Sequence, residues 1–175
     1  MKNKYLKTYA FIDGQNLNLS VSKNIYKNKK LEYKGWKLDY KKFRIFLKDK
    51  FRVNKVFYFI GKIKGNEKLY ANLKSYGYDL VFKSTVKDSD GKPKGNVDAE
   101  LVLHASAIEY NHFDKAIIVA GDGDYCCLIK YLEQKKKLFK IIIPNAKSES
   151  TLLKEFQKYK MFVNHHKDKL EYIKK

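Results

Sequence analysis

The sequence has little cysteine and no long apolar segment. Its two cysteines, Cys126 and Cys127, are adjacent, so they cannot form half of a C-x-x-C zinc site and are poorly placed to bridge each other. We expect one of them to be a small buried residue and the other to be partly exposed, in a reduced protein. No charged leader followed by an apolar core opens the chain, and no apolar run approaches membrane-spanning length. These absences predict a soluble cytoplasmic protein that does not bind membranes.

Several catalytic signatures are also missing. The chain has no G-x-x-x-x-G-K-[ST] phosphate loop, and Cys126 stands where a dinucleotide fingerprint needs its third glycine. Serine, histidine and acidic residues form no recognisable triad spacing. A phosphatase with an aspartyl nucleophile usually has a second acid two residues later, and Gln15 occupies that place after Asp13. The sequence therefore argues against these four classes of enzyme.

Acidic residues and arginine are scarce. The chain has 38 Lys plus Arg against 19 Asp plus Glu, a formal net charge of +19, and only Arg44 and Arg52 are arginines. An A/T-rich genome explains the preference for lysine over arginine, but not the two-to-one excess of basic residues. So positive a surface favours polyanions, above all nucleic acids. The lysines alternate with aromatic residues such as Tyr26, Tyr33 and Trp36, which either stack on bases or pack on the core.

Apolar segments of strand length alternate with amphipathic segments of helical spacing. The predicted strands are 9–12, 53–60, 78–82, 116–120 and 139–143, with 161–163 as a short edge strand. The predicted helices start after the first strand and at 39–51, 66–76, 95–111, 126–132, 151–159 and 168–173. This alternation predicts an α/β fold with a central, mostly parallel sheet of five or six strands flanked by helices. At 175 residues, the chain is expected to form one domain, 1–175.

Two polar segments interrupt this pattern. The basic run 27–30 is interpreted as solvated, and segment 83–94 as a surface loop or a short hairpin that turns at Asp90-Gly91. The helix that follows is expected to bury Leu101, Ala105 and Ile108 on one side, with His104 as a buried histidine.

Acidic residues follow two of the predicted strands. Asp122 and Asp124 come directly after strand 116–120, where Gly121 and Gly123 would allow a sharp turn, and Asp13 ends the first strand. With short right-handed connections, the first and fourth strands become neighbours, so these acids face one crevice at the carboxyl ends of the strands. Each acid could also simply cap the helix that follows it.

A further acid could come from the helix that precedes the fourth strand. Asp98 and Glu100 are two residues apart, about 200° around a helix, so only one can face the crevice, and periodicity does not decide which. Carboxylates that converge need a cation, and an all-oxygen site suits Mg²⁺ or Mn²⁺. Such a metal can activate water and neutralise charge during hydrolysis of a phosphodiester.

Three segments carry a family resemblance. F-I-D-G-Q-N at 11–16, K-G-N-V-D-A-E-L at 94–101 and V-A-G-D-G-D-Y at 119–125 resemble, in order, the signature blocks of the NYN domain family, the LabA-like branch of the PIN-like metal-dependent ribonucleases. The resemblance covers about 9–153 and leaves 154–175 as a C-terminal helical extension. It implies a three-layer PIN-like (Rossmann-like) fold, a Mg²⁺ or Mn²⁺ cofactor and RNA as substrate.

The resemblance also assigns roles to individual residues. It implies that the catalytic, metal-binding acids are Asp13, Asp98, Asp122 and Asp124, which selects Asp98 over Glu100. Asn16 would orient the Asp13 carboxylate or a bound water, and Lys94 would contact a substrate phosphate. Three features depart from the family pattern: Ala120 stands where relatives commonly have serine, His104 where many have an acid, and 157–160 where many have an Ala-Asp pair.

Three hypotheses follow from the sequence. The first is a metal-dependent ribonuclease; the second is a non-catalytic RNA-binding module or adaptor with the same fold; the third is a structural subunit of a larger assembly. The sequence distinguishes neither endo- from exonucleolytic cleavage, nor one metal from two, nor a monomer from a homodimer.

Overall fold

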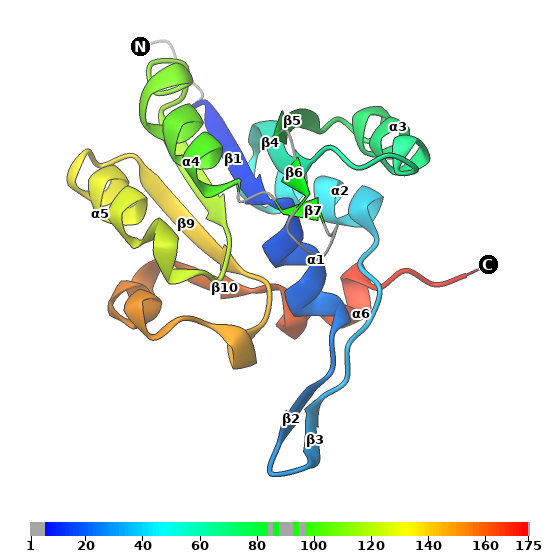
Figure 1. Cartoon of the computed structure of the whole chain (residues 1–175). Coiled ribbons are helices and arrows are strands. Elements are labelled where there is room, and N and C mark those ends of the chain that lie inside the picture. The colour runs from blue at the N-terminus through cyan, green and yellow to red at the C-terminus, as the bar shows by residue number, and fades with distance from the viewer. Residues whose placement is uncertain (1–5, 84–85, 88–92, 95–96, 175) are drawn as a thin grey trace.

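Six strands form a parallel sheet in the order β10-β9-β8-β1-β4-β5 (Figure 1). The computed structural model describes residues 6–83, 86–87, 93–94 and 97–174, without the side chains of 86–87 and 93–94. The strands are β1 (Thr8–Asp13), β4 (Val53–Gly61), β5 (Asp79–Lys83), β8 (Lys115–Val119), β9 (Leu138–Ile143) and β10 (Lys160–Phe162). The parallel sheet is confirmed, and the first and fourth predicted strands, β1 and β8, are neighbours as expected.

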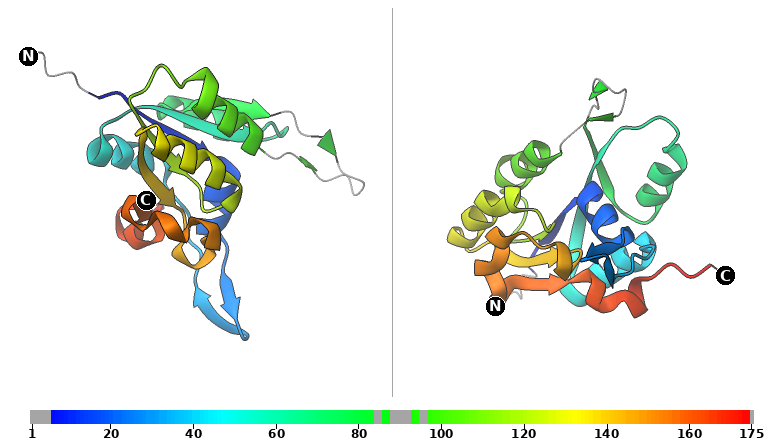
Figure 2. Two further views of the ribbon diagram at one scale, coloured as in Figure 1. Left: turned by 90° about the vertical axis from the view of Figure 1, so that its left-hand side faces the viewer. Right: turned by 60° about the horizontal axis from the view of Figure 1, so that its bottom comes forward.

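Helices cover both faces of the sheet, which gives three layers (Figures 1 and 2). They include α1 (Gly14–Ser22), α2 (Tyr40–Phe51), α3 (Glu67–Ser75), α4 (Asp98–Leu103) and α5 (Cys126–Gln134). Along β1, Ala10 and Ile12 pack with α1, α2 and α3, whereas Phe11 packs on the opposite face with α4 and α5. Because side chains alternate along a strand, one apolar run supplies both halves of the core.

The helix that follows the polar segment 83–94 changes from an α-helix to a π-helix. After α4 the chain continues as a π-helix, η1 (His104–Ile108). Leu101 and Ala105 are buried as predicted, but Ile108 is 48% exposed, which corrects its assignment to the buried stripe. A π-helix bonds residue i to residue i+5 and so holds more residues in each turn than an α-helix does, and the α-helical spacing therefore fails beyond Ala105. The His104 ring is only half-buried, against Phe57 and Phe59.

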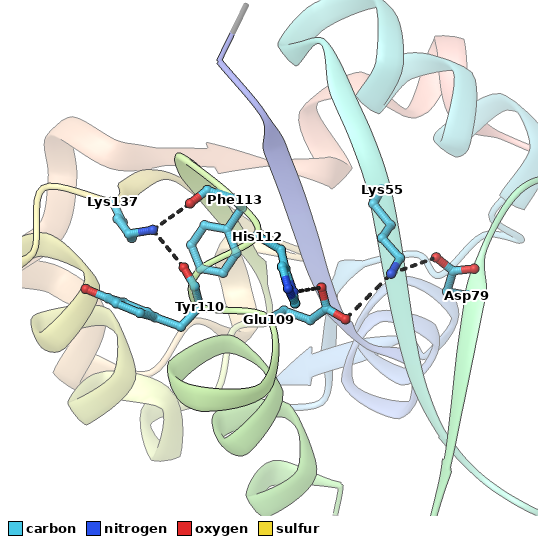
Figure 3. Close-up of polar contacts among 7 residues, drawn as sticks. All are labelled: Lys55, Asp79, Glu109, Tyr110, His112, Phe113 and Lys137. Carbon is cyan, nitrogen blue, oxygen red and sulfur yellow. Dashed lines mark hydrogen bonds and ion pairs between the residues drawn. The ribbon is translucent and has the colours of Figure 1, made fainter.

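A lysine fixes the loop beyond this π-helix (Figure 3). The Lys137 ammonium donates to the backbone oxygens of Tyr110 and Phe113, at 2.7 and 2.5 Å. The same ammonium lies 4.5 and 4.6 Å from the ring centroids of these two residues. Burial lowers the pKa of Lys137. Nearby, Lys55 pairs with Glu109 at 3.6 Å, so charged groups anchor η1 to the amino-terminal half of β4.

A β-hairpin projects from the body of the protein after α1 (Figures 1 and 2). Its strands, β2 (Ile25–Lys27) and β3 (Lys30–Tyr33), are antiparallel, and Asn28 and Lys29 have φ values of 48° and 62°. Two consecutive left-handed residues suit a tight hairpin turn. The basic run is exposed as expected, but it forms a hairpin that the sequence did not reveal. Trp36, in contrast, is buried in the core.

The remaining elements are short. Strands β6 (Val86–Lys87) and β7 (Pro93–Lys94) are antiparallel, which confirms a hairpin in the polar segment, while the turn predicted at Asp90-Gly91 lies outside the described residues. Helix 151–159 is the 3₁₀ helix η4 (Thr151–Tyr159), and the predicted helix 168–173 is shorter, α6 (Lys167–Leu170). Further 3₁₀ turns are η2 (Gly123–Tyr125), η3 (Ala146–Ser148) and η5 (Val163–His166). Within the described residues, no helix is both long and apolar enough to cross a membrane.

Candidate metal centre

Asp13 lies at the carboxyl end of β1, where the chain turns into α1. Its Oδ1 accepts the backbone N–H of Asn16 at 2.9 Å, so Asp13 caps the helix, and the side chain is almost fully buried. Gly14 is required next to it, because a Cβ there would lie 2.3 Å from the Tyr58 ring and 2.8 Å from the Phe59 oxygen. This close approach packs the start of α1 against β4 and holds the carboxylate at the strand end.

The hydroxyl of Tyr125 joins Asp13 to Asp98. It lies 2.9 Å from Oδ2 of Asp13 and 2.5 Å from Oδ1 of Asp98. A phenol carries one proton, so it can donate to only one of the two carboxyl groups at a time. Burial raises the pKa of Tyr125, and the charge of Asp13 and the contact with Asp98 raise it further, so the hydroxyl keeps its proton at neutral pH.

The environment of Asp13 makes its charged form more costly than it would be in water. Burial raises its pKa, hydrogen bonds from Asn16 and Tyr125 oppose that rise, and the nearby Asp98 adds to it. Among the described residues, no basic side chain forms an ion pair with Asp13. The site thus holds a buried acid that a bound cation would stabilise in its charged form.

The structure separates Asp98 from Glu100, which periodicity alone could not do. Asp98 begins α4 and contacts Tyr125, whereas the Glu100 carboxylate lies 3.4 Å from the Lys83 ammonium, on the edge strand β5. Two residues on a helix point in different directions, and here only Asp98 turns toward Asp13. Of the two acids, Asp98 is thus the one that lies beside Asp13.

Asp122 and Asp124 follow β8, on the strand next to β1. Asp122 caps η2 by accepting the backbone N–H of Asp124 at 3.1 Å, and it is half-buried, while Asp124 is exposed. Neither Gly121 nor Gly123 has a positive φ, so the turn does not use the left-handed backbone that glycine adopts easily. Gly123 is instead needed for packing: a Cβ there would lie 2.5 Å from Oγ of Ser150.

Asn16 connects the two acidic turns. Its side-chain oxygen accepts the backbone N–H of Gly121 at 2.9 Å, while its own backbone N–H binds Asp13. The contact of Asn16 with Asp13 is therefore made by its backbone, and its side chain holds the turn before Asp122. Lys94, the predicted phosphate contact, lies in β7, and its side chain is outside the described part of the structure.

The four predicted acids are therefore only partly assembled. Asp13 and Asp98 meet at Tyr125, and Asp122 and Asp124 form a separate pair on the neighbouring turn. In the described part of the chain, no group of three or more His, Cys, Asp or Glu side chains has the arrangement of a metal site. The donor set nevertheless fits Mg²⁺ or Mn²⁺, since it consists of carboxylate oxygens and includes the buried Asp13 without a basic partner.

Sequence reasoning overlooked Tyr125. The residue ends the block V-A-G-D-G-D-Y, and no role was assigned to it. It is fully buried, and its hydroxyl makes two contacts with acids. A buried tyrosine needs a hydrogen-bonding partner for its hydroxyl, and the acids of the other two motif blocks, Asp13 and Asp98, were candidates.

Comparison with models of protein families shows to which family the chain belongs. The family model of the NYN domain matches residues 7–162. The chain belongs to the NYN domain family. All three signature blocks fall within the match, and the NYN domain has a PIN-like nuclease fold. No curated protein gives a significant match.

One solved structure shares the fold of this NYN-domain chain. A protein of unknown function from Vibrio parahaemolyticus is 20% identical, with a TM-score of 0.75 over 97% of this chain and 99% of that chain. At this identity the similarity concerns the fold alone. It extends beyond the sheet to almost the whole chain, including the segment after η4.

Proposed function

We propose that this protein is a cytoplasmic ribonuclease that hydrolyses RNA phosphodiester bonds with Mg²⁺ or Mn²⁺. The observation that carries the proposal is the meeting of Asp13 and Asp98 at one hydroxyl, at the carboxyl end of β1, within an NYN domain. In open α/β sheets, this edge is where ligands bind, at the point where strand order reverses. Here that point lies between β1 and β8.

The proposed metal ligands are Asp13, Asp98, Asp122 and Asp124. When bound, the metal would lower the pKa of a coordinated water and offset the charge of the phosphate. Tyr125 would hold the Asp13 and Asp98 carboxylates close together, because its protonated hydroxyl contacts both. Asn16 would hold the Gly121 turn, and with it Asp122, close to β1. Lys94 would contact a phosphate of the substrate.

The charge of the chain supports RNA as the substrate. With a net charge of +19, the protein attracts polyanions at long range. The β2–β3 hairpin concentrates this charge on a projecting element, with exposed Lys27, Lys29 and Lys30 beside Tyr26, which is 61% exposed. Lysines next to an exposed aromatic ring suit single-stranded nucleic acid.

A cleavage assay tests the proposal. In Mn²⁺, purified protein is expected to cleave single-stranded RNA, and Asp122→Asn to lower the rate by about a hundredfold or more, as losses of catalytic groups commonly do. Asp49→Asn is the matched control, since Asp49 is an exposed acid near the end of α2. If the pure protein cleaves no RNA, or Asp122→Asn cleaves as fast as the parent, the enzyme proposal fails.

The second candidate is a non-catalytic RNA-binding module. It is favoured by one observation, that the described acids do not form a group of three or more suited to a metal. It predicts salt-sensitive RNA binding that neither EDTA nor Asp122→Asn affects. The same preparations therefore separate the two candidates.

A further inference from the structure

A cavity of about 330 Å³ opens beside the candidate metal centre. It lies between the start of α1, the end of β4 and the start of α3. Gly14 and Gln15, which line it, follow Asp13 directly in the chain. A group bound in the cavity would therefore lie next to the end of β1, where the proposed reaction takes place.

The lining of this cavity is uncharged. Three amides face it, those of Gln15, Asn18 and Asn66, together with Tyr40 and Tyr58 and the apolar side chains of Ile60 and Leu69. Although the chain has 38 Lys plus Arg, none of the lining residues that the structure describes is basic or acidic. The described lining therefore offers no charged side chain to pair with a phosphate, and it suits a neutral group that has apolar faces and polar edges.

The amide of Asn18 is held by a neighbouring tyrosine. The Tyr40 hydroxyl donates to its Oδ1 at 3.4 Å, which leaves its NH₂ group to donate elsewhere. The Tyr58 hydroxyl donates to the Gly14 oxygen at 3.3 Å, and the two tyrosine rings meet edge to face, with centroids 5.9 Å apart. Asn66 precedes α3 without a side-chain capping bond, so its amide is also available.

Nucleobases have the chemistry that this lining matches. A base offers flat faces for aromatic and apolar contact and an edge of donors and acceptors that amide side chains recognise. The volume is at the lower end of the range of small-molecule pockets, roughly 300–1,000 Å³, which suits a single base with its sugar. A second, more open hollow of about 360 Å³ shares Asn18 and Tyr40 and leads toward Trp36 and Lys37, at the base of the hairpin. A strand could continue along that path.

We propose that this cavity binds one nucleobase of the RNA strand and so fixes the strand relative to Asp13. Gln15, Asn18 and Asn66 contact the edge of the base, and Tyr40 and Ile60 contact its faces. The inference rests on the proposed function in that it takes RNA as the ligand. It does not require cleavage, because base binding is a property of the protein without metal.

The test combines abasic RNA with pocket variants. Fluorescence anisotropy in EDTA measures the affinity of a short single-stranded RNA in which each base in turn is replaced by an abasic site. In the parent protein, one abasic position is expected to weaken binding about tenfold, the size of one lost stacking contact. The double variant Asn18→Ala/Asn66→Ala should weaken binding of intact RNA and become insensitive to that position. Asn72→Ala, an exposed amide on α3 outside the cavity, is the control.

Every outcome of this test bears on the proposal. If no position matters, or if the abasic penalty is the same in the double variant as in the parent, the proposal is overturned. It is also overturned if free adenosine or uridine binds the cavity while RNA affinity depends on no base, since the ligand is then a nucleoside. Loss of base dependence upon Gln15→Ala gives independent support should the double variant fold poorly. An intact base effect in a protein that cleaves no RNA would leave this inference standing and refute only the ribonuclease.

Discussion

The carboxyl groups of Asp13 and Asp98 meet at the hydroxyl of Tyr125, although they come from a strand end and a helix start far apart in the chain. Such an arrangement costs folding free energy when both acids are charged, because buried like charges repel. The unusual feature is a single neutral donor between two acids. Its consequences can be measured without any assumption about the substrate.

Replacing Tyr125 with phenylalanine tests the bridge that its hydroxyl forms between Asp13 and Asp98. The change removes one hydroxyl and keeps the ring, so both carboxyl groups lose a buried hydrogen-bonding partner. We expect Tyr125→Phe to lower the free energy of unfolding by about 1–3 kcal/mol in EDTA, as hydrogen bonds to charged groups contribute. Urea unfolding at neutral pH measures it. Tyr172→Phe, which alters a half-exposed ring near the C-terminus, should change stability far less, and equal effects would contradict the bridge.

Asp13→Asn is expected to stabilise the metal-free protein by about 1 kcal/mol at neutral pH, as removal of a strained functional group commonly does. Asparagine can still accept the Asn16 N–H and cap α1. The buried charge and its repulsion from Asp98 disappear. Thermal unfolding in EDTA measures the gain. Asp49→Asn is the control, and a loss of stability upon Asp13→Asn would contradict the account.

The pH dependence of this gain has a defined sign. Because burial raises the pKa of Asp13 in the folded state above the ordinary value of 3.8, the unfolded chain ionises first as pH rises. Below that value Asp13 is protonated in both states, so its titration adds nothing to the difference in stability between the parent and Asp13→Asn. As pH rises through the folded-state pKa, the parent loses stability relative to the variant, and the difference then stays constant. A difference that shrinks with rising pH would contradict the assignment.

The hairpin lysines should govern the salt dependence of RNA binding. Replacing Lys27, Lys29 and Lys30 with alanine is expected to weaken binding and to reduce the slope of log affinity against log salt by about 0.7 for each lost phosphate contact. Alanine at three lysines near the amino ends of the strands, Lys48, Lys50 and Lys135, is the control of equal charge. If both triple variants behave alike, the hairpin makes no specific contact and only net charge attracts RNA.

Lys137 should contribute to stability at the opposite end of the sheet. Lys137→Met keeps the apolar stem but leaves the Tyr110 and Phe113 oxygens without their shared donor. We expect a loss of about 1–3 kcal/mol in urea unfolding, with no effect on RNA binding beyond that of one charge. Lys135→Met, at an exposed position nearby, is the control.

The sequence predicted the framework of the fold well for physical reasons. Strands such as β8 are buried on both faces and read as unbroken apolar runs, and Asp13 and Asp39 cap helices by local hydrogen bonds. The failures are equally specific. Hydrophobic periodicity does not encode the π-helical winding of η1, nor the β2–β3 hairpin with its left-handed Asn28–Lys29 turn.

The candidate site could be predicted only in part. Motif residues place Asp13 and Asp122 at neighbouring strand ends, because parallel strands deliver their carboxyl ends to one edge. The link through Tyr125 and the cavity bounded by Asn18 and Asn66 arise from segments that are distant in sequence. Periodicity along one element cannot reveal either of them.

The most direct test of the account is the position of Mn²⁺ in crystals of the protein soaked in that ion, seen by anomalous scattering. The account predicts a strong peak between Asp13 and Asp98 that carboxylate oxygens of Asp122 or Asp124 also approach, and its loss in Asp13→Asn crystals. The proposed metal centre would be contradicted if crystals of the soaked parent show no peak at this site. It would also be contradicted if a peak appears elsewhere and none of these four carboxylates contacts it.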